Sequence, residues 1–220
     1  MKKLYNGNLL PLTPFKKTKK KLGLYPVVDS VLWIKRLLRI GVSVIQLRIK
    51  NKNNEELKND IKNAVVLGKK YNAFVFINDY YDLAIKYGAY GVHLGQEDLL
   101  VSDLLTIHKN GLRLGISTHN KNELIIAKYI CPSYISIGHI FPTKTKKMLS
   151  FPQGLKTLKT MVKSTSNYST VAIGGISVEK VLDVLSTGVG GISLVSAITK
   201  VNNWDYITKT LLKLIENKKL

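Results

Sequence analysis

The sequence predicts an α/β fold, a single-domain (β/α)8 TIM barrel, and three observations support this. From residue 22 onward, short apolar runs alternate with longer amphipathic ones. The short runs are rich in Val, Ile and Tyr and end in Gly, Asn, Asp or Ser, as buried parallel strands do. The composition does not shift along the chain. An open doubly wound sheet is the alternative, but no G-x-G-x-x-G motif follows the first predicted strand.

The predicted strands follow one another in regular order. Each is a run of apolar residues bounded by turn-forming residues. The eight runs cover residues 22–29, 43–50, 73–79, 91–95, 113–119, 134–141, 170–176 and 191–198.

Helices are predicted between the strands. Apolar residues recur at helical spacing in 54–72 and again at the C-terminus, from Trp204 to Ile215. We therefore expect a basic N-terminal extension over 1–21 and a barrel domain over 22–220. The longest interruption, 142–152, lies between the sixth strand and its helix, where an active-site lid is a reasonable expectation.

Composition narrows the class of protein. The 220 residues contain 34 Lys and Arg against 14 Asp and Glu, for a net charge of +20. A single cysteine, Cys131, favours a reducing compartment, and no apolar run reaches the ~20 residues of a membrane span. The N-terminus lacks the apolar region of a signal peptide. We expect a cytoplasmic protein that binds no membrane.

The positive charge also raises the possibility of nucleic-acid binding. Most lysines, however, are spread over the polar faces of predicted helices, and only KKTKKK, at 16–21, is a cluster. Such a block before the first regular element is more typical of a solvated arm. No nucleic-acid partner is therefore expected.

The second predicted strand contains the segment QLRIK. Side chains alternate along a strand, so Gln46, Arg48 and Lys50 share one face while Leu47 and Ile49 share the other. If the two aliphatic residues pack under the helices, the polar set points into the barrel. Buried cations need an anionic partner. An internal salt-bridge network and an anionic ligand such as a phosphate or diphosphate are equally compatible with this motif.

Acidic residues are scarce in this chain, yet they occur after the third and fourth strands. Asp79 ends the third strand, next to Asn78, and Asp98 lies three residues beyond the fourth strand, next to Glu97. Asn and Asp are also common helix caps. Neighbouring strands lie ~4.8 Å apart, which would let Asp79 and Asp98 converge at the barrel mouth. Two carboxylates near cations are typical of a Mg²⁺ site completed by phosphate oxygens.

The remaining strand ends also contain polar residues or glycine. Ser117 lies at the end of the fifth strand, where a capping role is as reasonable as a ligand contact. PTKTKK, at 142–147, follows the sixth strand and is suited to clamping phosphate. The seventh and eighth strands end in Gly174–Gly175 and Val195–Ser196. Barrel enzymes often bind phosphate in the loops after these strands through backbone N–H groups.

Taken together, these segments resemble the signature blocks of the thiamine-phosphate synthase family. The resemblance extends from Leu22 to about Ile198 and keeps the family's order. Singly the blocks are weak signals, but seven of them at matching strand ends are specific. They are QLRIK (46–50), IND (77–79), GVHLGQEDL (91–99), GISTH (115–119), FPTKTK (141–146), VAIGGIS (171–177) and VSAI (195–198).

The resemblance implies a Mg²⁺-dependent coupling of hydroxymethylpyrimidine diphosphate with thiazole phosphate, which releases pyrophosphate. It implies Mg²⁺ ligands at Asp79 and Asp98, and stabilisation of the leaving diphosphate by Arg48, Lys50 and Lys146. The pyrimidine diphosphate would be bound by Gln46, Asn78, Ser117 and Lys146 together with the 46–50 segment, which includes Leu47 and Ile49. The thiazole phosphate would be bound by Thr143, Lys144, Thr145, Gly175, Val195 and Ser196.

Two other functions are weighed against this one. A thiazole tautomerase of the same fold would not need the diphosphate-binding residues that are present here. A nucleic-acid-binding protein would need clustered basic residues interleaved with aromatics, a pattern absent from the sequence. We expect small-molecule substrates, and a monomer or a small homo-oligomer.

Overall fold

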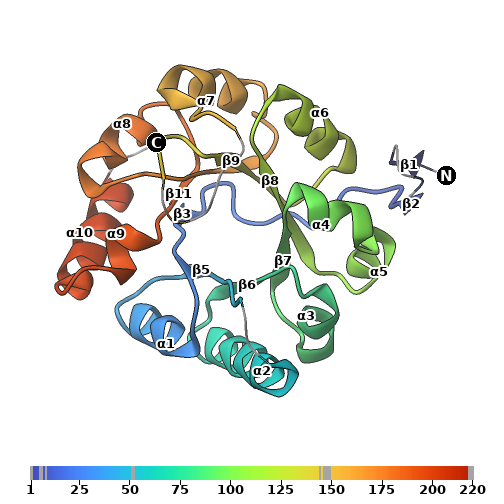
Figure 1. The fold of residues 1–220 in the computed structure, drawn as a ribbon, viewed down its shortest axis with the longest axis horizontal. Helices are drawn as coiled ribbons and strands as arrows, with labels where there is room; N and C mark the ends of the chain where they lie inside the picture. The colour runs from blue at the N-terminus through green and yellow to red at the C-terminus, as the bar shows by residue number, and fades with distance from the viewer. Residues whose placement is uncertain are drawn as a thin grey trace.

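The chain forms a curled parallel sheet surrounded by helices (Figure 1). This computed structural model describes residues 2–4, 7, 9–50, 53–143, 145 and 150–217. The sheet has nine strands in the order β3-β11-β10-β9-β8-β7-β6-β5-β4, so each neighbour is the next or previous strand in the chain apart from the β3–β11 pair. The fold is a single α/β unit that is TIM-barrel-like.

The sheet strands agree closely with the predicted apolar runs. Their bounds are β3 Gly23–Leu24, β4 Val27–Val28, β5 Val44–Leu47, β6 Phe74–Asn78, β7 Gly91–Leu94, β8 Arg113–Thr118, β9 Tyr134–Gly138, β10 Ser169–Ile173 and β11 Gly191–Ser193. A separate two-stranded sheet pairs β1 (Lys2–Lys3) with β2 (Leu9–Leu10).

The first predicted strand is divided into β3 and β4. Tyr25 and Pro26 separate the two pieces, and proline has no N–H to donate to a sheet ladder. Hydrogen bonds nevertheless continue along this segment: Val27 N donates to Leu194 O at 3.1 Å, and Gln46 N donates to Pro26 O at 2.9 Å. The segment therefore supplies both ends of the sheet order, with β3 beside β11 and β4 beside β5.

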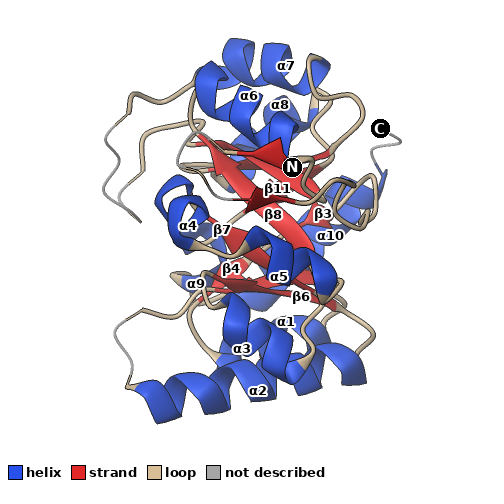
Figure 2. Cartoon of the chain, turned by 90° about the vertical axis from the view of Figure 1, so that its right-hand side faces the viewer, coloured by secondary structure: helices blue, strands red, loops and turns tan. Residues whose placement is uncertain are grey.

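The helices pack around the outside of the sheet (Figure 2). Their bounds are α1 Val31–Arg39, α2 Asn54–Lys70, α3 Tyr81–Tyr87, α4 Gln96–Val101, α5 Leu104–Lys109, α6 Lys121–Ile130, α7 Gly154–Lys163, the 3-10 helix η1 Val178–Lys180, α8 Val181–Leu185, α9 Ser196–Thr199 and α10 Trp204–Asn217. The predicted helices at 54–72 and at the C-terminus correspond to α2 and α10.

Local capping explains several helix boundaries. Asn53 accepts a hydrogen bond from Glu56 N at 2.9 Å, and Asn120 accepts one from Glu123 N at 2.9 Å. These bonds satisfy backbone donors that the first turn of a helix leaves free. Cys131 ends α6 in a left-handed conformation, away from the ends of the strands that carry the polar residues.

The prediction of a strand over 191–198 is wrong beyond Ser193. The backbone turns at Val195, and Ser196–Thr199 is helical. A short continuous apolar run does not distinguish a buried strand from a buried helical turn, which explains the error. The change places Val195 and Ser196 at the start of α9 rather than within the sheet.

The apolar core has two parts. The larger cluster lies between the sheet and the helices and includes Leu47 and Ile49. The smaller cluster contains Tyr25, Phe76 and Tyr134, whose aromatic rings contact one another with centroids 5.1–5.7 Å apart. The smaller cluster fills the inside of the curled sheet.

The basic segment 16–21 crosses the end of the sheet where the strands begin. Ser133 Oγ donates to Lys16 O at 2.6 Å, Arg113 Nε to Lys17 O at 3.1 Å, and Ser169 Oγ to Lys19 O at 2.7 Å. The side chains of the lysines are exposed while their backbone is held. The expected solvated arm is thus replaced by a segment attached to the fold. No helix in the described part of the chain is long and apolar enough to cross a membrane.

Candidate active site

Two carboxylates meet where β6 and β7 end. Asp79 directly follows β6, and Asp98 lies in the first turn of α4, directly after β7. Their side chains are within hydrogen-bonding reach of each other. The structure therefore brings the predicted pair together, as expected for residues that follow the same ends of neighbouring parallel strands.

The backbone around the carboxylates explains how they are held. Asp79 has a positive φ of 65°, and its N–H donates to His93 O at 3.0 Å. Asp98 Oδ2 accepts a hydrogen bond from Gly95 N at 3.2 Å. A Cβ at Gly95 would lie 2.8 Å from the same Oδ2, so only glycine lets this carboxylate fold back onto the backbone. Glu97, which directly precedes Asp98 in the sequence, is exposed.

The electrostatics of the pair favour a cation. Burial, followed by the charge of Asp98, raises the pKa of Asp79 to about 6, and Arg48 and Lys50 oppose that shift only in part. No group of three His, Cys, Asp or Glu side chains that could hold a metal is found among the described residues. Two carboxylates suit Mg²⁺, which usually takes one or two protein carboxylates and fills its remaining positions with water or phosphate oxygens.

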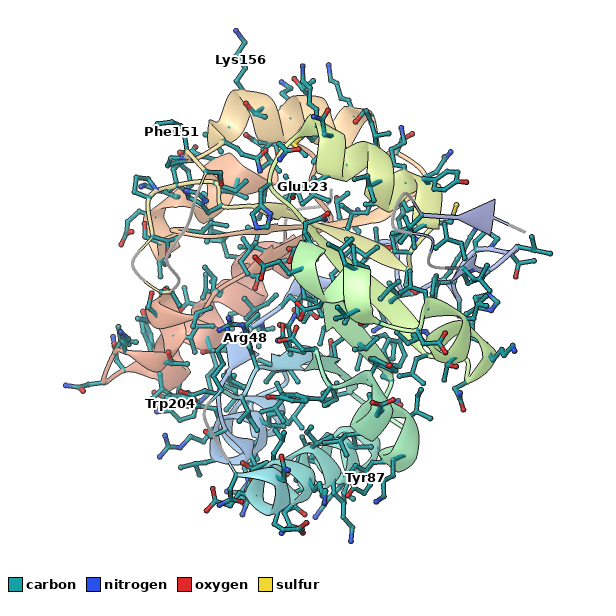
Figure 3. All side chains as sticks on the ribbon, turned by 45° about the vertical axis from the view of Figure 1, so that its right-hand side comes forward. Arg48, Tyr87, Glu123, Phe151, Lys156 and Trp204 are labelled. Atoms are coloured by element: carbon teal, nitrogen blue, oxygen red, sulfur yellow. The ribbon has the colours of Figure 1, made fainter. Side chains whose placement is uncertain are left out.

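Cationic side chains follow the neighbouring strand β5. Arg48 is partly exposed, its N–H donates to Val28 O at 2.7 Å, and its side chain lies near the centre of the ring of strands (Figure 3). Lys50 is exposed and close enough to lower the pKa of Asp79. The side chains of Leu47 and Ile49 are buried toward the helices, so only their backbone groups can face a ligand.

The inward side chains form a connected set. Asn78 is buried at the end of β6. Gln46 Nε2 donates to Tyr25 Oη at 3.2 Å, and Tyr25 Oη lies 2.6 Å from Tyr134 Oη. The contacts continue to His93 on β7 and Ser117 on β8. Tyr134 Oη lies 2.7 Å from His93 Nδ1, and His93 Nε2 lies 2.8 Å from Ser117 Oγ.

Glycines make room for this set. A Cβ at Gly115 would lie 2.2 Å from the Tyr134 ring, and a Cβ at Gly91 would lie 2.6 Å from the Phe76 ring. The two aromatic rings therefore cross the inside of the sheet where β7 and β8 present no side chain. Sequence reasoning identified Gln46 and Ser117 but missed Tyr25 and Tyr134, because tyrosine in an apolar run is typical of any strand.

The second group of predicted residues lies after β9, β10 and β11. Thr145 N donates to Thr143 Oγ1 at 3.2 Å. A Cβ at Gly175 would lie 2.4 Å from Pro142 O, so this glycine, with φ of 66°, lets the 141–143 loop pack directly on it. Val195 precedes α9 and Ser196 begins it. Lys144 and Lys146 lie outside the described residues.

Three further polar atoms occur in this second region. His139 Nδ1, Gln153 Oε1 and Ser193 Oγ are buried and have no hydrogen-bond partner among the residues that the structure describes. Gln153 is positioned by its other atoms, since its Nε2 donates to Gly138 O at 2.9 Å and its backbone N–H donates to His139 O at 2.9 Å. Sequence reasoning gave none of the three a ligand contact, and their spacing in the chain contains no motif.

The chain is similar to known proteins over most of its length. The thiamine monophosphate synthase family matches residues 24–198. Thiamine-phosphate synthase of Photorhabdus laumondii is 59% identical over 213 residues, covering 97% of this chain and 99% of the relative. The enzyme of the same name from Proteus mirabilis is 62% identical over 204 residues, covering 93% and 95%.

A solved structure, thiamine phosphate pyrophosphorylase from Pyrococcus furiosus, superposes with a TM-score of 0.81 at 32% identity and covers 90% of this chain and 97% of its own. A protein of the same description from Bacteroides thetaiotaomicron, at 18% identity and a TM-score of 0.65, supports the fold alone. The sequence matches extend across the strands and both groups of polar residues. On these grounds the chain belongs to the thiamine monophosphate synthase family of enzymes.

Proposed function

We propose that this chain couples hydroxymethylpyrimidine diphosphate with thiazole phosphate to give thiamine phosphate and pyrophosphate. The observation that carries the proposal is the meeting of Asp79 and Asp98 beside the cations of the β5 end. That arrangement suits a diphosphate accompanied by a divalent cation. The relatives are named thiamine-phosphate synthase, which gives thiamine phosphate as the product.

The reaction proceeds by displacement at the methylene carbon of the pyrimidine. The carbon–oxygen bond to the diphosphate breaks, and its electron pair leaves with pyrophosphate. A pyrimidine-stabilised cation remains, and the thiazole nitrogen then supplies the electron pair of the new carbon–nitrogen bond. Negative charge grows on the departing group, so groups that stabilise it lower the barrier. The positioning of both substrates accounts for the rest of the rate increase.

The residues divide into three roles. Asp79 and Asp98 would hold Mg²⁺, which, when bound, neutralises charge on the diphosphate. Arg48, Lys50 and Lys146 would stabilise the departing diphosphate. Gln46, Asn78 and Ser117, with the 46–50 backbone, would hold the pyrimidine substrate, and the thiazole phosphate would be bound by Thr143, Lys144, Thr145, Gly175, Val195 and Ser196.

The finer architecture is part of the same proposal. We infer that 22–29 acts as one strand and that the curled sheet functions as a closed (β/α)8 barrel, which is supported by the hydrogen bonds that this segment makes toward both β11 and β5. Residues 1–21 serve as the extension and 22–220 as the catalytic unit. The protein works in the cytoplasm, as a monomer or a small homo-oligomer.

The direct test is to mix the purified protein with both substrates and Mg²⁺ and to measure pyrophosphate and thiamine phosphate. We expect equal amounts of the two products, and none when EDTA removes the metal. Isomerisation of the thiazole without release of pyrophosphate would contradict the proposal and favour a tautomerase. Omission of either substrate is the control, because hydrolysis of the diphosphate alone would release phosphate groups without coupling.

A further inference from the structure

A hollow lies at the end of the sheet where the strands begin, opposite the candidate active site. It encloses about 310 Å³, at the lower end of the range for small-molecule pockets. Its walls come from the last turns of α2, the first residues of β6, the turn before β7 and the start of β8. Both cationic and aromatic side chains line it, so its chemistry differs from that of an ordinary gap between helices.

The aromatic wall of the hollow is a fixed stack. The rings of Phe74 and Tyr90 are parallel, with centroids 4.0 Å apart. The Arg113 guanidinium lies 4.1 Å from the Tyr90 centroid, and the Lys19 ammonium lies 4.8 Å from the Phe74 centroid. Each ring therefore has both faces covered, and only the ring edges are available to a ligand. Because the edge of an aromatic ring carries partial positive charge, this wall favours an anion.

Arg113 is the first cation of the hollow and is held on two sides. Its Nε donates to Lys17 O at 3.1 Å, and its plane rests on Tyr90. Tyr90 is itself held by Thr18, whose Oγ1 lies 2.9 Å from the tyrosine Oη. The two terminal amino groups of Arg113 make no hydrogen bond to residues that the structure describes. A guanidinium held in this way offers oriented donors to a phosphate or a carboxylate.

Lys69 is the second cation and reaches the hollow from α2. Its Nζ donates a long hydrogen bond of 3.4 Å to Tyr87 O. A Cβ at Gly88 would lie 3.2 Å from the same Nζ, so this glycine, with φ of 67°, leaves the space that the ammonium group uses. The position of Lys69 therefore depends on the turn before β7.

The hollow carries positive charge without an acidic counterpart. No Asp or Glu is among the described residues that line it. The two ion pairs found within the described part of the chain involve neither Lys69 nor Arg113. Two cations beside one small volume repel each other, and an anion bound between them would turn that repulsion into attraction.

We propose that this hollow is a second ligand site, which binds a small phosphate monoester. The phosphate would lie between Lys69 and Arg113, and the organic part would pack on Val65 and Val75, which are buried. A dianion matches two cations that come from different elements, whereas a carboxylate carries a single charge. A single-stranded nucleic acid is disfavoured, because its bases need an open ring face on which to stack. The site does not depend on the proposed function.

Titration of the isotope-labelled full-length protein with phenyl phosphate, followed by NMR, tests the proposal. We expect the amide signal of Ala89 to shift with a Kd of about 1 mM or lower. Benzoate, which keeps the ring but has one charge, should bind at least about threefold more weakly. Binding should also weaken as the ionic strength rises. Amide signals of Gly95 and Ser196 report separately on any binding at the candidate active site.

Substitutions on α2 and at the turn before β7 give the comparison. Lys69→Met should raise the Kd measured at Ala89 about tenfold, which corresponds to ~1.4 kcal/mol. Lys70→Met is the matched control, because it removes the same charge from the adjacent exposed position and should change the Kd by less than about twofold. Gly88→Ala displaces the Lys69 ammonium without removing its charge, and should weaken binding by an intermediate factor.

The outcomes separate the alternatives. No shift at Ala89 at about 10 mM phenyl phosphate, or equal weakening by Lys69→Met and Lys70→Met, would overturn the site. Benzoate binding as tight as that of phenyl phosphate would overturn the assignment to a phosphate. A short single-stranded RNA that displaces phenyl phosphate from Ala89 at far lower concentrations would show a polynucleotide surface in place of a small-molecule site.

Discussion

The two halves of the candidate active site differ in how completely their polar groups are bonded. On the β5–β8 side, Gln46, His93 and Ser117 belong to one continuous set of hydrogen bonds. On the β9–β11 side, buried atoms of His139, Gln153 and Ser193 have no hydrogen-bond partner within the described part of the chain. A buried polar atom without a partner is unfavourable, so the second half gains most when a ligand supplies the missing bonds. Under the proposed function, the protein preorganises one half and the substrate would complete the other.

The largest effect is expected at the carboxylate pair of the preorganised half. Asp98→Ala should lower turnover about a thousandfold, because a single carboxylate would remain to hold the metal. Pyrophosphate release at saturating Mg²⁺ measures this, and circular dichroism verifies folding. Glu97→Ala is the matched control, since that neighbouring carboxylate is exposed, and it should keep full activity. Comparable loss in both variants would refute the metal assignment.

The second-largest effect is expected where the 141–143 loop packs on Gly175, on the β9–β11 side of the site. Gly175→Ala would place a Cβ 2.4 Å from Pro142 O, at a φ of 66°, and should destabilise the fold by about 2–4 kcal/mol and raise the KM for the thiazole phosphate. Gly154→Ala separates strain from collision: its φ is 70°, yet nothing lies within 4 Å of the new atom. We expect Gly154→Ala to lower the free energy of unfolding, measured with urea, by about 1 kcal/mol. Equal losses would show that the 141–143 loop does not depend on Gly175.

A smaller effect is expected from pH in the metal-free protein. The pKa of Asp79 is raised to about 6, so the folded state holds this proton more tightly than the unfolded state does. The resulting stability is present below about pH 4 and is lost as the pH rises through 6. Because Asp79 is partly exposed, we expect a loss of about 1 kcal/mol after solvent screening.

Urea unfolding of the metal-free wild-type protein between pH 4 and 7 measures this loss. Asp98→Asn lacks the neighbouring charge but keeps the burial of Asp79, so the variant should show a smaller loss. Saturating Mg²⁺ should abolish the difference in slope, because the metal compensates the two carboxylates. A wild-type stability that rises over this window relative to the variant would contradict the raised pKa.

The smallest effect on stability tests the unpartnered atoms directly. Ser193→Ala removes a buried hydroxyl that has no hydrogen-bond partner among the described residues. It should change the free energy of unfolding by less than about 0.5 kcal/mol while raising the KM for the thiazole phosphate. Ser133→Ala is the contrasting control, because its hydroxyl bonds Lys16 O and Leu114 N. Ser133→Ala should lower the free energy of unfolding by about 1–2 kcal/mol and should leave the KM for the thiazole phosphate unchanged. An unaltered KM in Ser193→Ala would remove this hydroxyl from the substrate site.

Sequence reasoning predicted the parts of the site that follow from periodicity. Alternation along a strand placed Gln46 inside and Leu47 outside, and the shared edge of parallel strands brought Asp79 to Asp98. The Tyr25–Tyr134 contact joins positions 109 residues apart. No local pattern indicates that pairing, because it depends on the curvature of the sheet and on the space left by Gly115.

Dependence on distant contacts, or on features that hydropathy does not report, also explains why the predictions for 191–198 and 16–21 were wrong. Residues 191–198 are uniformly apolar apart from two serines, so hydropathy could not locate the change from β11 to α9. The anchoring of 16–21 depends on Ser133 and Ser169, which lie more than a hundred residues away and read as ordinary strand-start residues.

The anchored lysine segment has a practical consequence for protein engineering. Hydropathy alone gives no reason against shortening the chain to begin at residue 22. The shortening would, however, remove the three carbonyl acceptors of Lys16, Lys17 and Lys19 and expose to water the end of the sheet beneath the aromatic rings. Such a truncated protein should precipitate readily. Tags or fusion partners placed ahead of the intact 16–21 segment would leave this end of the sheet covered.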